Sequence, residues 1–270
     1  MTVRESFQTD GAFATLKKLH DIGYRAVEMS QVEMSEANVK EMKTAVDDLG
    51  MDICALSTVV ENTNPRRRMD SLAEDFDKLL EHAELLGTRY LRIGALPFEY
   101  MGKKDKYLEY AEQLNKYGRK LKEHGLKLFY HNHHFEFEKF DGKFALDLLV
   151  ENTDPEYVGI ELDTHWIQRG GQDPIAWIRK LKGRVEIVHL KDYRIAPPKE
   201  FTGPQSMAEM VQFAEIGEGN LDFPGIIQAC IECGTEYMPI EQDNTYGRDP
   251  FDSLRISMEN IKKMGFADHF

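Results

Sequence analysis

The sequence has few cysteines, no long apolar run and no basic leader. Three cysteines in 270 residues are too few for the disulfide framework that stabilises small secreted proteins. No apolar run approaches the ~18 residues that a membrane-spanning helix needs. Residues 1–10 show no basic segment followed by an apolar one, as a secretory signal would. We therefore expect a soluble protein of the reducing cytoplasm.

Basic residues are outnumbered by acidic ones, with 34 Lys and Arg against 47 Asp and Glu and a formal net charge of −13. Binding to a phosphate backbone depends on clustered Lys and Arg that release its counterions. We therefore expect neither nucleic acid nor a membrane surface as a partner. A neutral or metal-chelated small molecule is easier to reconcile with this charge.

The chain also lacks any Pro/Gly/Ser-rich linker or low-complexity tract, so we expect residues 1–270 to form one domain. This length is typical of an eight-stranded α/β barrel, which needs about 250 residues to close. Hydrophobic residues make up 41% of the sequence, which is ample for a core. A single barrel is the simplest prediction.

Short apolar runs alternate with longer segments of helical periodicity, the pattern of βα units in a parallel sheet. Strands are predicted at residues 25–29, 52–57, 90–94, 127–131, 159–163, 186–190 and 237–241. Helices are predicted near residues 10–22, 35–49, 69–86, 104–124, 144–151, 174–181, 223–233 and 250–264. Eight helices imply eight strands, so the pattern predicts a (β/α)8 barrel.

Two parts of this barrel are unusual. Only residues 1–6 precede the first predicted helix, so the first strand is expected to be short or incomplete. A barrel lacking one strand has two unpaired edges that another segment or chain would cover. Residues 193–220, with Pro197, Pro198 and Pro204, form a long irregular stretch after a strand. Its place at the mouth of a barrel predicts an active-site lid.

Ligand-type residues end four consecutive predicted strands, namely His131, Asp163, His189 and Glu241. Side chains at the carboxyl ends of barrel strands converge at the mouth. A single histidine in such a place is more often a hydrogen-bonded structural residue than a ligand. Four residues of this kind together would leave buried like charges uncompensated without a cation. The pattern therefore predicts a site for one divalent metal ion.

Five motifs follow one another along the chain: YHNHHFEF at 130–137, ELDTHW at 161–166, VHLKDY at 188–193, IGEG at 216–219 and PIEQD at 239–243. In this order they resemble the sugar phosphate isomerase/epimerase family of xylose isomerase-like barrels, whose relatives include inosose dehydratases and ketose epimerases. The resemblance implies that Asp163, His189 and Glu241 are metal ligands. It also places His131 where the family commonly has a glutamate ligand.

The histidine at position 131 is a departure from the family pattern. The resemblance implies that epimerases use the replaced glutamate and the last-strand glutamate, here Glu241, as acid and base on opposite faces of the substrate. The loss of one carboxylate counts against two-base epimerisation, and the histidine-rich version looks more like the dehydratase branch.

Oxygen and nitrogen ligands without a thiolate suit Mn²⁺, Co²⁺, Zn²⁺ or Mg²⁺. Chelation of a substrate carbonyl and a neighbouring hydroxyl would acidify the carbon between them, because the metal stabilises the enediolate. Glu241, His133 or His165 could then take the proton. Reprotonation would give isomerisation or epimerisation, whereas loss of a β-hydroxyl would give dehydration.

Four further residues are candidates for contact with the substrate. Glu136 could bind a hydroxyl, Trp166 could stack on an apolar sugar face, and Lys191 could hold an oxyanion or phosphate. Their plain structural alternatives are a solvated loop carboxylate, a core aromatic ring and an ion-pair partner of Asp192. Glu28, at the end of an early strand, either contacts the substrate or orients another group.

The leading hypothesis is a metal-dependent isomerase or epimerase of a sugar or sugar phosphate. A lyase that dehydrates a keto-sugar or keto-inositol is the alternative. An apurinic-site endonuclease would need a basic groove and usually more metal ligands, and a non-catalytic carbohydrate-binding barrel would need no metal. Members of the family that the chain resembles are often dimers or tetramers, so a homo-oligomer is expected.

Overall fold

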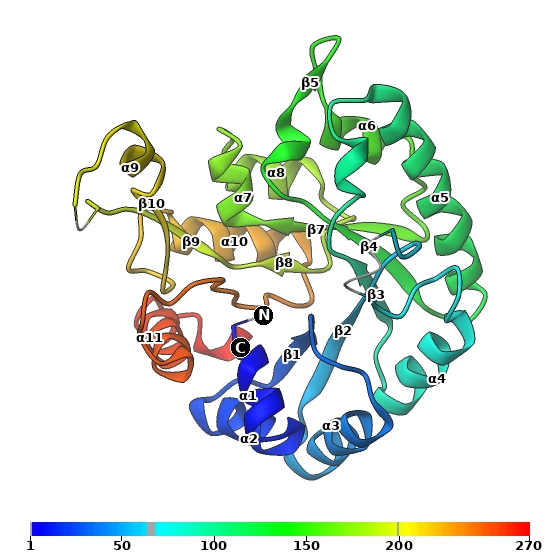
Figure 1. The fold of residues 1–270 in the computed structure, drawn as a ribbon. Helices are drawn as coiled ribbons and strands as arrows, with labels where there is room; N and C mark the ends of the chain where they lie inside the picture. Colours follow the sequence, from blue (N-terminus) through cyan, green and yellow to red (C-terminus); the bar gives the residue numbers. More distant parts are fainter. Residues whose placement is uncertain (1, 64–67, 199) are drawn as a thin grey trace.

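The computed structural model describes residues 2–63, 68–198 and 200–270. Within them, parallel strands form one curved sheet in the order β1-β2-β3-β4-β7-β8, and helices cover its outer face (Figure 1). The strands are β1 Ala26–Met29, β2 Asp52–Thr58, β3 Tyr90–Ile93, β4 Lys127–His131, β7 Val158–Asp163 and β8 Val188–His189. This arrangement confirms the α/β barrel class predicted from the sequence.

The main helices of the outer layer are α2 Ala12–Ile22, α3 Glu36–Leu49, α4 Phe76–Leu86, α5 Lys104–Lys122, α6 Ala145–Glu151, α7 Thr164–Arg169, α8 Pro174–Lys180, α10 Phe223–Cys233 and α11 Pro250–Lys263. A small hairpin, β5 Lys139–Phe140 and β6 Lys143–Phe144, and the 3-10 helices Phe98–Tyr100, Phe135–Phe137 and Ala267–His269 complete the elements around them. Helix α7 was not predicted, and α4 begins at Phe76, whereas the sequence pattern predicted a start near residue 69. Ahead of α4, Asp75 accepts a hydrogen bond from the Ser71 backbone, which holds residues 71–74 in a turn.

The seventh predicted strand, residues 237–241, pairs with the sheet only through isolated parallel bridges from Tyr237 to Ile187 and from Ile240 to Leu190. Where the sequence predicted a short first strand, the structure has helix α1, Arg4–Thr9. In the part of the chain that the structure describes, β1 has a strand partner only in β2. Helix α1 lies beside the unpaired edge of β1 (Figure 1). Just before this helix, Thr2 Oγ1 accepts a hydrogen bond of 3.0 Å from the Gln242 backbone.

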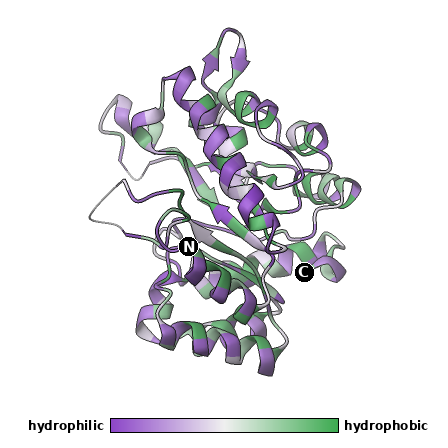
Figure 2. Ribbon diagram, turned by 90° about the vertical axis from the view of Figure 1, so that its right-hand side faces the viewer, coloured by the Kyte–Doolittle hydropathy of each residue, from purple (hydrophilic) through white to green (hydrophobic). Residues whose placement is uncertain are grey.

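The core lies between the sheet and its helices. Every residue of β7 is buried, as expected of a parallel strand covered on both faces. Helix α4 buries Leu79, Ala83 and Leu86, which share one face because they are spaced by four and three residues. Figure 2 shows the same division, with hydrophilic residues along the outer faces of the helices and hydrophobic residues toward the interior. Among the described helices, none has both the length and the apolar character needed to cross a bilayer.

The packing of β7 against β4 predicts that a methyl group added at Gly159 lowers the stability of the fold. A Cβ atom at Gly159 would overlap the ring of Phe129, its register partner on β4. Both residues lie in the middle of a buried sheet, where overpacking typically costs about 1–3 kcal/mol. We expect Gly159→Ala to lower the free energy of unfolding by that amount, as measured by urea titration. Phe129→Leu in the same chain should recover part of the loss, and strictly additive losses would contradict this explanation.

Within residues 193–198 and 200–220 the structure has regular elements, although the sequence pattern suggested an irregular stretch. Strands β9 Asp192–Ile195 and β10 Val211–Ala214 pair in antiparallel fashion, with helix α9 Pro204–Ala208 between them. The hairpin and α9 project from the barrel to one side (Figure 1). Asp192 anchors its base, because its carboxylate accepts hydrogen bonds from the backbone of Gly217, Gly219 and Leu221. The role of this excursion as a lid stays a prediction.

Candidate metal centre and active site

Four buried side chains meet at the carboxyl ends of the sheet. His131, Asp163, His189 and Glu241 each offer one ligand atom, and these atoms all lie within 4.8 Å of one another. None of the four residues is more than 6% exposed. The structure therefore brings together the four residues that the sequence pattern predicts as metal ligands.

The strands position these groups directly. His131, Asp163 and His189 are the last residues of β4, β7 and β8, which lie side by side in the sheet. The Glu241 backbone donates a 3.1 Å hydrogen bond to Leu190, which fixes the final segment beside β8. Asp163 Oδ1 caps helix α7 by accepting from Trp166 N at 3.0 Å. Its other oxygen, Oδ2, is left facing the cluster.

The charge of this region is strongly unbalanced. Among the described residues, five carboxylates, those of Glu28, Glu161, Asp163, Glu241 and Asp243, contact two permanent cations, Arg92 and Lys191. An excess of negative charge in a largely buried site is costly unless protons or a metal ion offset it. Burial raises the pKa of Asp163 to about 6, although Lys191 and His189 oppose that shift.

The donor set fits one divalent cation. Asp163 Oδ2 is buried and accepts no hydrogen bond from the described residues, although its ion-pair partner Lys191 Nζ lies 3.0 Å away. Two imidazole nitrogens and two carboxylate oxygens form a ligand set typical of Zn²⁺, Mn²⁺ and Co²⁺. The residues present are therefore chemically suited to the ion that the sequence pattern predicts.

A cavity of about 510 Å³, with both apolar and polar residues in its wall, borders the cluster. Its wall includes His131, His133, Lys191, Glu241 and Asp243. Residues at or just after the carboxyl ends of β1, β2 and β3 complete it, among them Gln31, Thr58, Asn62 and Glu99. Hydroxyl, amide and carboxylate groups can exchange hydrogen bonds with a polyhydroxylated molecule. The cavity is therefore suited to a small polar ligand beside the metal site.

Lys191 is the most deeply placed cation of the site, at 1% exposure. Its ammonium nitrogen lies 2.6 Å from Glu241 Oε2 and 3.0 Å from both Asp163 Oδ2 and Asp243 Oδ2. Burial would lower the pKa of Lys191, but the three carboxylates outweigh that effect and raise the pKa above its usual value. The ammonium is therefore charged, and it does not form the ion pair with Asp192 that the sequence alone leaves open.

His133 is the histidine that faces the cavity without belonging to the cluster. Its ring stacks on Phe135 with centroids 5.2 Å apart, and its Nδ1 is buried without a hydrogen-bond partner among the described residues. Burial, together with the charges of Lys191 and Arg92, lowers the pKa of His133 to about 3. His133 is therefore neutral near pH 7.

Three other predicted site residues lie behind the cavity wall. His165 is fully buried, and its Nδ1 donates to the Asp192 carbonyl at 3.1 Å.

Both Glu136 oxygens accept hydrogen bonds within the protein, from Tyr130 Oη at 2.5 Å and from His133 N at 2.8 Å. Burial raises the pKa of Glu136 to about 7. Trp166 lies in helix α7, with Lys191 Nζ 5.3 Å from its ring centroid. Contact of these three with a substrate stays a prediction.

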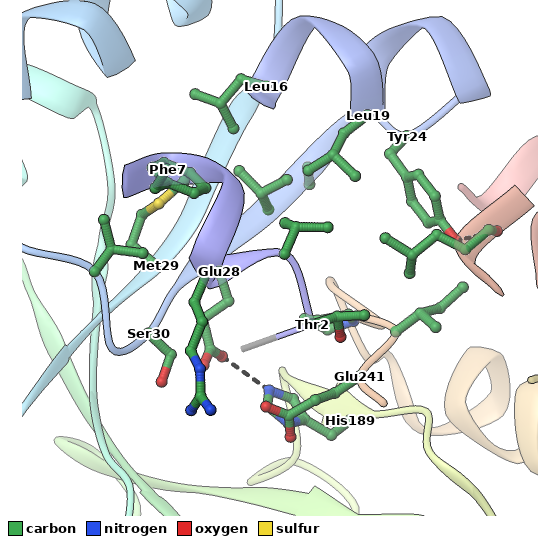
Figure 3. A pocket seen from close by; sticks show the side chains of 18 residues that line it. Thr2, Phe7, Leu16, Leu19, Tyr24, Glu28, Met29, Ser30, His189 and Glu241 are labelled. Carbon is green, nitrogen blue, oxygen red and sulfur yellow. Dashed lines mark hydrogen bonds and ion pairs between the residues drawn. The ribbon is translucent and has the colours of Figure 1, made fainter. Parts of the chain in front are cut away.

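Glu28 contacts two charged or ligand side chains of the site, and its contact with a substrate stays a prediction. Its Oε2 lies 3.0 Å from His189 Nε2, and its Oε1 lies 3.3 Å from Arg92 Nε. Figure 3 shows Glu28 and His189 facing each other, with Glu241 beside the imidazole. These three residues border a small apolar pocket of about 80 Å³ that extends toward Phe7 and Leu16. Glu28 is not one of the described residues that line the cavity of about 510 Å³.

Sequence reasoning missed Arg92, Glu161 and Asp243, which complete the ionic network. Arg92 lies between Leu91 and Ile93 in β3, and a charged residue inside an apolar strand was a visible signal. Glu161 and Asp243 belong to motifs that were recognised, but only their neighbours were assigned roles. Their contribution depends on contacts between strands, which no local pattern displays.

Comparison with known proteins gives concordant matches. A model of the xylose isomerase-like TIM barrel family matches residues 16–264. Inosose dehydratases of Clostridium tetani and Clostridium beijerinckii are 32% and 31% identical over 133 and 165 residues, which is 47% and 58% of this chain. The alignments cover 44% and 54% of those relatives, so the chain spans about half the length of the curated relatives it matches.

Solved structures share the fold at low sequence identity. A sugar phosphate isomerase/epimerase from Parabacteroides distasonis has a TM-score of 0.76 and 23% identity, with 98% of this chain and 92% of that chain covered. The IOLI protein, solved with a bound zinc atom, has a TM-score of 0.69 and 15% identity, with 96% and 93% covered. At these identities the likeness extends to the fold alone.

Proposed function

The chain belongs to the xylose isomerase-like TIM barrel family, and on that premise we propose that it is a metal-dependent isomerase or epimerase of a sugar or sugar phosphate. The observation that carries this proposal is the buried cluster of His131, Asp163, His189 and Glu241, two of which, His131 and Glu241, line an adjoining cavity. Such a cluster satisfies the needs of a reaction that removes a proton beside a carbonyl group, because carbanionic charge requires a cation nearby.

A divalent ion held by the four residues would supply Lewis-acid polarisation of a substrate carbonyl. Glu241 is the proposed base. Burial raises its proton affinity, but Lys191 and His189 outweigh burial and hold the pKa of Glu241 well below its usual value. Glu241 is therefore ionised, so it has the protonation state of a base, but its lowered pKa makes it a weaker base than a carboxylate whose pKa lies near the operating pH.

Lys191 and His133 have complementary proposed roles. The Lys191 ammonium lies 2.6 Å from Glu241, so it can donate a hydrogen bond to an oxyanion that forms next to the base. His133 is neutral and at the cavity wall, and its ring nitrogens can orient a substrate hydroxyl. Proton removal and return at one face need a single base, which agrees with the presence of His131 where the related pattern has a glutamate.

Dehydration of a keto-sugar or keto-inositol is the second candidate. It is favoured by the curated relatives, which are named inosose dehydratases, and by the histidine-rich ligand set. In this reaction the same proton is removed, and the hydroxyl on the next carbon leaves as water. The two candidates therefore share the base and the cation, and they differ only in the step after proton removal.

Deuterium exchange separates the two reactions. We expect the metal-reconstituted protein, incubated in D₂O with a panel of ketoses, sugar phosphates and keto-inositols, to place deuterium in one compound that keeps all its oxygen atoms, as read by mass spectrometry. A product that has lost one water would instead establish the dehydratase. Binding of a sugar without exchange or turnover, in the presence of bound metal, would contradict both and favour a carbohydrate-binding barrel.

A further inference from the structure

One carboxylate oxygen outside the predicted ligand set contacts both ligand histidines. Glu161 Oε1 lies 2.9 Å from His131 Nδ1 and 3.0 Å from His189 Nε2. Glu161 lies two residues before Asp163 on β7, the strand between those that carry the two histidines. Side chains two residues apart share a face of a strand, so Glu161 lies one layer below Asp163 in the interior of the barrel.

This contact fixes which nitrogen of each ring is free. An ionised carboxylate can only accept, so His131 Nδ1 carries the hydrogen that Glu161 binds. His189 Nε2 likewise carries a hydrogen, which lies 3.0 Å from both Glu28 Oε2 and Glu161 Oε1 and is shared between these two carboxylates. The opposite nitrogens face the cluster. His131 Nε2 and His189 Nδ1 each lie 3.9 Å from Asp163 Oδ2, and His189 Nδ1 lies 3.3 Å from Glu241 Oε2. The two histidines therefore present different nitrogens to the same point.

Arg92 keeps Glu161 ionised in a buried place. Its Nε lies 2.9 Å from the same Oε1 atom, and Arg92 is only 6% exposed. A guanidinium at this distance favours the charged form of a carboxyl group. Arg92 also pairs with Glu28, which reaches His189 Nε2 from the other side at 3.0 Å (Figure 3).

The same atoms permit a competing interpretation. Glu28, Glu161 and His189 themselves form a group whose ligand atoms lie within 4.8 Å of one another. A second cation there would have to sit beside the guanidinium of Arg92, which already contacts both carboxylates. Like charges at such a distance repel strongly in a buried site. The position is therefore filled by a permanent cation of the protein, and Glu161 is left as a hydrogen-bond acceptor.

We propose that Glu161 is a positioning residue that holds both ligand imidazoles in fixed tautomers and orientations, so that His131 binds the metal through Nε2 and His189 through Nδ1. This inference rests on the proposed metal site. Such carboxylate partners of metal-bound histidines fix ring orientation and raise ligand basicity, and their loss typically weakens metal binding 10–100-fold. Here Glu161 Oε1 contacts both His131 and His189, so one substitution of Glu161 should change the orientation of both ligand rings.

The test is Co²⁺ titration of the metal-free protein, followed by visible absorption, for the parent and for Glu161→Gln. We expect one site in both, a dissociation constant raised about 10–100-fold in the variant, and an altered Co²⁺ absorption spectrum that reports changed ligand orientation. Glu186→Gln is the matched control, because Glu186 is a partly buried carboxylate paired with Lys127 outside the cluster. Its affinity and spectrum should equal those of the parent.

Glu161→Asp covers the case in which the glutamine variant does not fold. It keeps a negative charge beside Arg92 but withdraws the oxygen by one methylene, so Co²⁺ affinity should fall while circular dichroism stays that of the parent. Unchanged affinity and spectrum in the folded variants would overturn the positioning role. Two Co²⁺ ions in the parent and one in Glu161→Gln would overturn it in favour of a ligand role. Absence of Co²⁺ binding in the parent would instead reject the metal site and the proposed function.

Discussion

Asp163→Asn is expected to abolish metal binding while leaving the fold intact. The amide removes one negative charge and one anionic ligand, so bound metal should fall from about one ion per chain to less than about a tenth of an ion, because metal affinity depends on deprotonated ligands. The helix cap should survive, since the amide oxygen can still accept from Trp166 N. Elemental analysis after reconstitution with Mn²⁺, Co²⁺ or Zn²⁺ and dialysis measures the effect.

Asp173→Asn provides the control for this experiment. Asp173 also caps a helix, accepting from Ile175 N at 2.9 Å at the start of α8, but it lies outside the metal cluster. The same chemical change there should leave the metal content at the parent level. Equal metal contents in Asp163→Asn and the parent would show that Asp163 is not a ligand. Equal losses in both variants would point to a change in the fold.

Lys191→Met is expected to reduce turnover with little loss of metal. Removal of one donor to a developing oxyanion typically lowers kcat about 10²–10³-fold. Methionine fills a similar volume, and the loss of the ammonium leaves Asp163 and Glu241 more negative, which favours a divalent ion. We therefore expect kcat to fall by that factor at saturating metal, with the metal dissociation constant equal to or below that of the parent. The assay uses the substrate identified by deuterium exchange.

Lys127→Met is the matched variant. Lys127 begins β4, the strand that His131 ends, and it pairs with Glu186 at the far end of the barrel from the cavity. Its loss should affect stability slightly and turnover within a factor of about two, since partly exposed ion pairs contribute little. If the kcat of Lys191→Met stays within about tenfold of the parent value, Lys191 does not act as a hydrogen-bond donor to the oxyanion.

The strands and the four clustered residues were predictable because their signals are local. A buried parallel strand is a short apolar run, and the residue that ends it is visible in the sequence, as with Ile160 and Leu162 before Asp163. The topology of α/β barrels then places successive strand ends at one mouth. No distance information was needed to predict that His131, Asp163 and His189 converge.

The supporting residues were not predictable in this way. Glu161 and Arg92 come from strands 69 residues apart in the sequence, and Glu28 reaches His189 across 161 residues. His133 and His165 follow strand ends equally closely, yet one faces the cavity and the other is buried behind it. Helix α7 begins directly after β7, and within it His165 packs against the rings of Tyr193 and Phe213.

The sequence by itself determined the α/β barrel class, the main alternation of strands and helices and the set of groups available to a cation, because apolar periodicity and residue chemistry are properties of short segments. Only the tertiary structure decided that α1 and not a strand lies beside β1, that β9 and β10 pair as a hairpin, and that Arg92 and Lys191 neutralise part of the buried charge. Those outcomes depend on which distant surfaces pack together, and the balance between burial and ion pairing is set only where they meet.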